Sequence, residues 1–229
     1  MPNIYSSTGD GWADSGEKAN WILARRDFGS ASDNNNTRDS SSVLVYRDSS
    51  KGGGEINVIR RAFMFFDTSG ISIAPSEATL KVRGYSGNNS DILVVKSTSA
   101  DPVVNGSFND LPDTMSEIGA TDGSGAGTLA GVSGLTYSSE IATWSTSGYN
   151  DIVLNSTARD DMASLDTFKI CIMDYDYDYL DIAPSLSGTV YRIGLYWTDN
   201  TGTSLDPYID YTAGVAAAVD NSVFFGCNF

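Results

Sequence analysis

The sequence predicts an all-β protein with one or two short helices and a C-terminal extension. Short runs of β-branched and aromatic residues recur along the chain, and clusters of glycine, serine and asparagine separate them. This alternation of strand formers and turn formers is typical of β-sandwiches. The 229 residues, with a mass of 24.4 kDa, are enough for one domain with a sizeable core. We therefore expect one sandwich domain over residues 1–213 and an extension over residues 214–229.

The strands are expected where apolar and β-branched residues cluster. In chain order they are Trp21 to Arg25, Val43 to Arg47, Ile56 to Phe66, Ala78 to Tyr85, Ile92 to Ser97, Ile152 to Leu154, Phe168 to Asp174, Val190 to Trp197 and Pro207 to Tyr211. The glycine-rich segment Lys51 to Glu55 joins two of them. Consecutive glycines tolerate the positive φ of tight strand connections, so this segment predicts a hairpin.

Two of these strands differ in the faces they bury. Residues Ala78 to Tyr85 alternate apolar and polar side chains, which predicts one buried and one solvated face. Residues Ile56 to Phe66 are apolar on both faces, with Phe63 and Phe65 on one of them. This strand should be covered on both sides. The cover is either the long irregular insertion near residues 99–150 or a neighbouring subunit.

Short helical turns are expected at Ser139 to Trp144 and at Thr157 to Leu165. The second follows Asn155, whose side chain suits a helix N-cap. Asp160 and Asp161 lie near its start, where the helix dipole favours negative charge. We expect these turns to close the ends of the sandwich.

Arg60 and Arg61 are adjacent in a strand, so one of them must point inward. A buried arginine requires a charged partner. We expect Asp67 or another carboxylate to pair with it as a structural clamp. Cys171 lies in an apolar run and is expected to be a small buried residue without a disulfide.

The extension over residues 214–229 is apolar and includes Phe224, Phe225 and Phe229. Leaving each phenylalanine in water would forgo about 1.5–3 kcal/mol of burial. The extension should therefore dock. It packs either on its own domain or on a partner, and the sequence favours neither alternative.

Charge and composition exclude several classes of function. The chain has 14 Lys and Arg against 29 Asp and Glu, a net charge of −15, so we expect no nucleic-acid partner. It has no histidine, which removes the usual general base and the commonest zinc ligand, and we expect no enzyme. No apolar run is long enough to cross a bilayer. The N-terminal residues lack the features of a signal peptide, so synthesis in a cytoplasm is expected.

The acidic run from Asp174 to Asp181 is the one candidate metal site. If the run is extended, Asp174, Asp176 and Asp178 lie on one face, and a bound Ca²⁺ would relieve their repulsion. With Asp181 they form the predicted ligand set. The alternative is a solvated strand edge with aromatic packing behind it. No other cofactor is expected.

Four tryptophans, at positions 12, 21, 144 and 197, are candidates for stacking on sugars. Tryptophans in β-sandwiches belong more often to the core. Paired carboxylates for glycoside cleavage are not singled out by any spacing among the acidic residues.

The passages Arg61 to Ile71 and Ala78 to Val82 resemble the DNRLRE-type β-sandwich, a group related to disaggregatase-type carbohydrate-binding modules. In both, an arginine opens a central strand that ends in Phe-Asp, and an Ala-x-Leu-x-Val strand follows after a short loop. The resemblance implies an antiparallel jelly-roll-like β-sandwich. The segment Asp206 to Tyr211 resembles its closing strand.

Three further passages resemble uncharacterised structural proteins of tailed phages, marine ones in particular. They are Trp144 to Ile152, Asp178 to Leu180 and Pro207 to Thr212. This resemblance implies a non-enzymatic virion protein on the particle surface: a head decoration, a head fibre or a tail-associated protein. It also implies self-association, by analogy as a trimer, and docking on other virion proteins.

In that function, Phe63, Phe65, Phe224, Phe225 and Phe229 are the expected partner-binding residues, at interfaces within or between subunits. The alternative function is a carbohydrate-binding module or adhesin domain that recognises surface polysaccharide. The two functions are compatible, because a virion surface protein can bind glycans.

Overall fold

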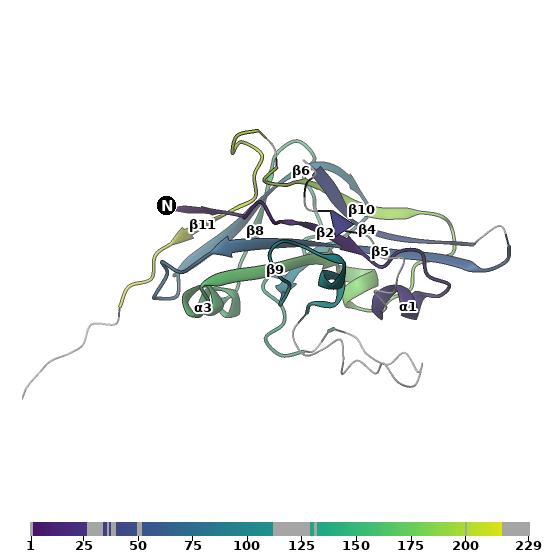
Figure 1. Ribbon diagram of the computed structural model, residues 1–229, viewed down its shortest axis with the longest axis horizontal. Helices are drawn as coiled ribbons and strands as arrows, with labels where there is room; N and C mark the ends of the chain where they lie inside the picture. Colours follow the sequence, from purple (N-terminus) through teal and green to yellow (C-terminus); the bar gives the residue numbers. More distant parts are fainter. Residues whose placement is uncertain are drawn as a thin grey trace, which may run out of the picture.

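The structure is a computed structural model, and it describes residues 2–26, 34–35, 37, 40–49, 52–111, 129–130, 132–199 and 201–216. Its strands are β1 (Asn3–Tyr5), β2 (Gly11–Asp14), β3 (Asn34–Asn35), β4 (Ser40–Ser49), β5 (Glu55–Asp67), β6 (Glu77–Asn88), β7 (Ile92–Lys96), β8 (Tyr149–Val153), β9 (Thr167–Asp174), β10 (Val190–Tyr196) and β11 (Tyr208–Thr212). The α-helices are α1 (Trp21–Arg26) and α3 (Ser156–Ser164), and two single helical turns lie at η1 (Asn105–Asn109) and η2 (Tyr175–Tyr179). The all-β prediction is confirmed (Figure 1).

The strands pair antiparallel in two connected layers. The short sheet has the order β1-β11-β6-β8. The long sheet contains β10, β4, β5, β2 and β3, with β9 and β7 added beside the second half of β5. Strand β6 belongs to both layers, because residues 77–83 pair with β11 and β8 while residues 84–88 pair with β10.

The main core lies between the two sheets. The short sheet contributes Leu80, Ile152 and Ile209, and the long sheet contributes residues such as Met64 and Ile170. All of these side chains are at most 1% exposed. The alternation predicted for residues 78–85 is therefore confirmed, since its apolar set faces this core.

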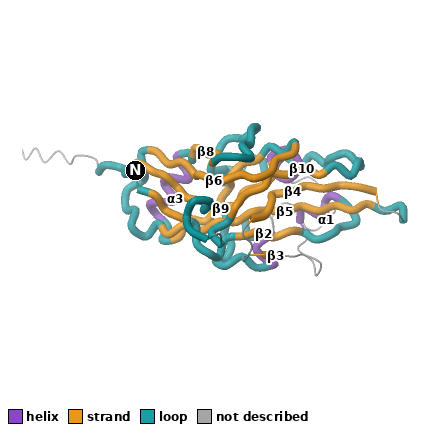
Figure 2. The backbone as a smooth tube through the Cα atoms, turned by 90° about the horizontal axis from the view of Figure 1, so that it is seen from above, coloured by secondary structure: helices purple, strands orange, loops and turns teal. Residues whose placement is uncertain are grey.

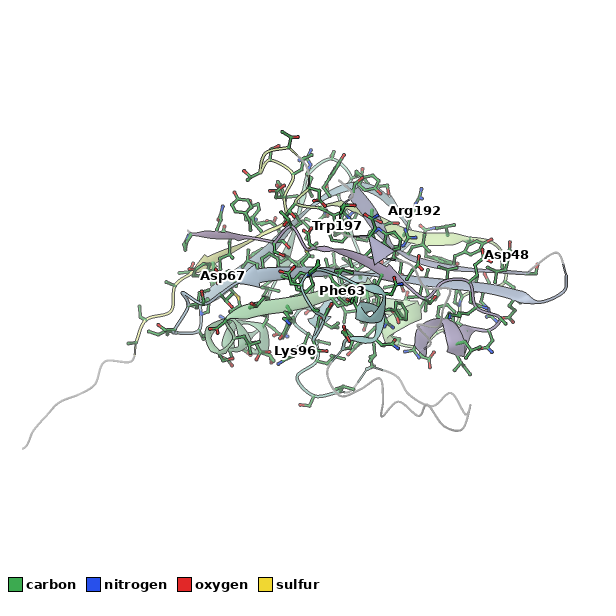
Figure 3. The ribbon with its side chains drawn as sticks, viewed as in Figure 1. Asp48, Phe63, Asp67, Lys96, Arg192 and Trp197 are labelled. Atoms are coloured by element: carbon green, nitrogen blue, oxygen red, sulfur yellow. The ribbon has the colours of Figure 1, made fainter. Side chains whose placement is uncertain are left out.

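A second core lies beneath the outer face of the long sheet. Phe63 and Phe65 of β5 point into it, together with Cys171 of β9. Helix α1, residues 103–111 and residues 129–135 supply the cover, through Trp21, Ala24, Val103, Phe108, Leu111, Leu129 and Leu135. Both faces of β5 are therefore buried within one chain, and the long insertion provides the cover (Figures 1 and 3).

Two predicted elements are wrong. Residues Trp21 to Arg25 form helix α1, whose first turn is capped by Asn20: its Oδ1 accepts a hydrogen bond from the N–H of Leu23 at 2.9 Å. Residues 139–144 form no helix. Ile141 instead forms an antiparallel β-bridge with Ile92 of β7.

Other local predictions are confirmed. Helix α3 begins after Asn155, whose Oδ1 accepts a hydrogen bond from the N–H of Ala158 at 3.0 Å. Strands β4 and β5 pair as a hairpin, with Gly53 at a φ of 87° in the connection. Figure 2 shows this long hairpin projecting at one end of the molecule, opposite the end where β11 leads to residue 216.

Candidate binding surfaces

The buried clamp on β5 is built around Arg61, which is fully buried. Its Nε and one Nη donate to the two carboxylate oxygens of Asp178 at 2.7 and 2.6 Å, a bidentate ion pair. The other Nη donates to the carbonyl of Phe108 at 2.6 Å, and the guanidinium lies 4.1 Å from the centre of that phenyl ring. Burial is the largest single effect on the pKa of Arg61 and lowers it, but the charge of Asp178 and its hydrogen bonds together outweigh burial and raise the pKa. The clamp joins β5, η1 and η2.

An inward arginine with a carboxylate partner was predicted, and both parts are confirmed, but the partner is not Asp67. Asp67 is exposed at the end of β5, where it accepts hydrogen bonds from the N–H and hydroxyl of Ser69 (Figure 3). Arg60 points to the other face and pairs with Asp14 at 2.9 Å.

The four aspartates proposed as Ca²⁺ ligands do not converge. The run turns helical at Tyr175, because the carboxylate of Asp174 caps η2 by accepting the N–H of Tyr177 at 2.8 Å. Asp178 pairs with Arg61, and Asp181 pairs with Arg25 at 2.8 Å. The described part of the chain contains no cluster of three or more acidic, histidine or cysteine ligands around a metal-sized space. The prediction of a calcium site is therefore wrong, because it assumed that residues 174–181 form an extended strand.

The predicted partner-binding residues fall into two groups. Phe63 and Phe65 are 0% and 1% exposed inside the second core, so they contact their own chain and are not available to a partner. Phe224, Phe225 and Phe229 lie outside the described residues. Of the tryptophans, three belong to the cores, at positions 12, 21 and 197, and only Trp144 is half-buried at the surface.

The outer face of the short sheet is polar and aromatic. Tyr5, Tyr208 and Tyr149 come from three strands and form one cluster, with ring centres 5.5 Å apart in the first pair and 5.3 Å in the second. Tyr5 is 40% exposed. The hydroxyl of Tyr149 donates to the carbonyl of Ser204 at 3.0 Å, and burial raises its pKa to about 12. We call these three residues the tyrosine cluster.

Charged residues adjoin the tyrosine cluster on the same face. Lys81 is opposite Tyr208 in the register and forms an ion pair with Asp151 at 2.6 Å. The guanidinium of Arg83 lies 5.9 Å from the ring centre of Tyr149. This face thus offers aromatic rings, cations and a carboxylate to solvent, whereas the outer face of the long sheet is buried by its cover.

A polar hollow of about 270 Å³ lies where β6 ends and β10 passes. Trp144 forms one wall, and its indole N–H donates to the carbonyl of Gly194 at 3.1 Å. The other lining groups are mostly polar, namely Asn88, Asn89, Ser90, Asp91 and Thr146, with Gly87, Ala142 and Ile193. The sequence singled out Trp144 but gave no sign of the loop after β6 that completes the hollow. We call it the Trp144 hollow.

Two buried carboxyl groups have perturbed acidity. Burial raises the pKa of Asp10 and of Asp174 to about 7 in each case, although hydroxyl groups of Thr198 and Ser90 respectively donate to them and oppose the shift. Both lie inside the protein, at 0% and 1% exposure. They act as internal hydrogen-bond acceptors for the surrounding loops.

Comparisons with known proteins found no matching family model and no similar curated protein. Within the described residues, no helix is long and apolar enough to cross a membrane.

Proposed function

We propose that this chain is a non-enzymatic structural protein of a tailed-phage particle that acts by self-association and by docking on other particle proteins. The sequence passages that resemble phage structural proteins suggest this class. The structural support is the difference between the two outer faces of the sandwich.

The outer face of the long sheet is covered by helix α1, by residues 103–111 and by Leu129 and Leu135. The short sheet leaves its outer face to solvent and places the tyrosine cluster there. Tyrosines offer a large contact area at a low cost in side-chain entropy and are enriched at protein interfaces. The tyrosine cluster on this solvent-facing side of the short sheet carries the proposal of a docking protein.

Incorporation into particles is the test. Particles would be assembled with wild-type protein, with Tyr5→Ser/Tyr149→Ser/Tyr208→Ser, and with a control, Glu77→Ser/Asp160→Ser, that changes exposed residues outside the tyrosine cluster. We expect the tyrosine variant to be lost from purified particles while the control is retained. Normal incorporation of a folded tyrosine variant would contradict docking through this face.

Binding of a glycan is a second candidate function, and the Trp144 hollow favours it. An indole beside amide, hydroxyl and carboxylate groups is the lining that sugar rings require, because their C–H faces stack on aromatics and their hydroxyls need polar partners. Trp144→Phe keeps an aromatic ring in the wall of the hollow but removes the indole. Thr146→Val keeps the shape of that side chain but removes its hydroxyl. We expect both to weaken binding on a glycan array relative to Thr201→Val, an exposed position outside the hollow. No binding by the wild-type chain would exclude this function.

A further inference from the structure

The chain contains two aspartate–proline peptide bonds, Asp101–Pro102 and Asp206–Pro207. Such a bond is open to attack from within its own residue, because the side-chain carboxyl group reaches the main-chain carbonyl carbon by closing a five-membered ring. The leaving group also favours the reaction, since the nitrogen of proline belongs to a tertiary amide and takes up a proton more readily than a secondary amide. The two bonds lie in different surroundings, and the difference singles out the second.

The side chain of Asp206 is buried and incompletely satisfied. Asp206 lies in the connection from β10 to β11, just before β11 begins at Tyr208 (Figure 1). It is 6% exposed, and its Oδ1 finds no hydrogen-bond partner among the residues that the structure describes. Buried polar atoms are normally hydrogen-bonded, so an unpartnered one requires an explanation, such as a part in chemistry. Burial, together with the charge of Asp199, raises the pKa of Asp206 and favours its protonated form.

The main-chain carbonyl of Asp206 faces a side-chain donor. The hydroxyl of Tyr149 lies 3.2 Å from this oxygen and 3.0 Å from the carbonyl oxygen of Ser204, so it donates to either. On the far side of the bond, the N–H of Ser6 donates to the carbonyl of Pro207 at 3.0 Å. A donor on a carbonyl oxygen stabilises the negative charge that develops there during nucleophilic attack. The bond is therefore held on both sides, and its carbonyl has a donor in place.

The first bond lacks this arrangement of the carboxyl group. Asp101 is exposed, so water reaches it. Its Oδ2 accepts a hydrogen bond from the hydroxyl of Ser7 at 2.7 Å, which holds the carboxyl group in another contact. The Asp101–Pro102 bond is thus a comparison bond of the same chemistry within the same chain.

We propose that the chain cleaves itself between Asp206 and Pro207, with the Asp206 carboxyl group as nucleophile and the Tyr149 hydroxyl as donor to the attacked carbonyl. A carboxyl oxygen forms a bond to the main-chain carbonyl carbon of Asp206, and the C–N bond to Pro207 breaks. The carboxyl proton moves to the nitrogen of Pro207, which becomes a new N-terminus. The product at Asp206 is a cyclic anhydride, and one water molecule hydrolyses it to two carboxyl groups. Nothing is oxidised or reduced, and water is the one outside reactant.

Cleavage would leave residues 207–229 as a separate peptide that remains bound in the sandwich. Its strand β11 lies between β1 and β6, paired with Asn3–Tyr5 on one side and with residues 77–81 on the other. The two pieces should therefore separate only when the protein unfolds. The event occurs once per chain and without turnover, so it is compatible with a non-enzymatic particle protein but does not depend on that function.

Comparison of the folded and the unfolded chain tests the proposal, because unfolding keeps both bonds but removes the contacts around them. The full-length protein would be incubated in a mildly acidic buffer, with and without enough urea to unfold it. Intact-mass spectrometry after denaturation then measures cleavage at each bond. We expect similar, slow hydrolysis of both bonds in urea.

In the folded chain, the 206–207 bond should be cleaved at least about tenfold faster than in urea, and the 101–102 bond no faster. A smaller acceleration at 206–207, or equal acceleration at both bonds, would overturn the proposal. Circular dichroism of the incubated samples verifies that the chain without urea stays folded.

Variants assign the two groups. Asp206→Ala removes the carboxyl group and should leave the bond intact in the folded chain. Tyr149→Phe keeps the ring but removes the hydroxyl, and it should slow cleavage at least about tenfold when folded while leaving the rate in urea unchanged. Tyr5→Phe, a matched loss of a hydroxyl from the tyrosine cluster, should be cleaved at the wild-type rate. Cleavage of folded Asp206→Ala at this bond, or of folded Tyr149→Phe at the wild-type rate, would overturn the proposed mechanism.

Discussion

Asp178→Asn should be among the most destabilising single substitutions in this protein. Wild-type Asp178 gives Arg61 two acceptor oxygens at 2.7 and 2.6 Å, and neither side chain is exposed. Asparagine has nearly the same shape but replaces one acceptor with an N–H₂ donor and removes the charge. The guanidinium then stays buried with carbonyl oxygens as its remaining acceptors.

The expected cost is about 3–5 kcal/mol, the range observed when one partner of a buried ion pair is removed. That is a large fraction of the roughly 5–15 kcal/mol that stabilises a typical domain. With a urea m-value of about 1–3 kcal/mol per molar, the unfolding midpoint should fall by at least about 1 M.

Urea unfolding followed by tryptophan fluorescence measures this change. Asp160→Asn is the control, because Asp160 is exposed on α3, and its effect should stay within about 0.5 kcal/mol. The double variant Arg61→Met/Asp178→Leu should lose less stability than Asp178→Asn, since no charge is left unpaired. A free energy of unfolding for Asp178→Asn within about 1 kcal/mol of the wild type would refute the reasoning.

Three further predictions concern the core and its acidity. The pKa of Asp10 is raised from 3.8 to about 7 by burial, so the folded protein keeps a proton that the unfolded chain loses in this interval. Stability from this group therefore falls as pH rises from about 4 to 7, by at most about 1.4 kcal/mol per pH unit. Asp10→Asn should thus gain stability over the wild type toward pH 7 in urea titrations, and a constant difference would contradict the assignment. Gly84→Ala should cost about 1–3 kcal/mol because its Cβ would lie 2.1 Å from a backbone oxygen. At Gly87 an added Cβ would lie 3.5 Å from the nearest atom of Trp144, which is an ordinary contact. Gly87→Ala should therefore lose far less stability, and differential scanning calorimetry of both variants measures the difference. Cys171 is fully buried and its thiol pKa is raised by burial, so the Cys227→Ser variant should take up no thiol reagent until it unfolds, and native labelling would argue against this packing.

The strands could be predicted from sequence because their signal is local. Alternation over residues 78–85 and the double apolar faces of β5 reflect which side chains each strand buries. The identity of the cover over Phe63 could not be predicted, because it depends on residues 103–111 and on Leu129 and Leu135, which lie in a part of the sequence without regular periodicity. Sequence patterns specify how much surface a strand must bury, and the partner is decided by tertiary packing.

The errors have the same physical origin. Residues Trp21 to Arg25 form a short apolar run that suits a strand as well as a helix, and the overlooked signal was Asn20 at the cap position. In the run after Asp174, the alternation of Asp and Tyr imitates a strand, but a capping carboxylate turns the backbone helical. Asp178 lies 117 positions from Arg61, so no local pattern could reveal their pairing.

The passage of β6 through both layers has a mechanical consequence. A single unbroken backbone is hydrogen-bonded to β11 and β8 over its first half and to β10 over its second. Tension applied to either sheet is therefore transmitted along covalent bonds to the other, and the layers cannot slide apart unless a ladder shears. A domain built in this way resists pulling as a single mechanical unit.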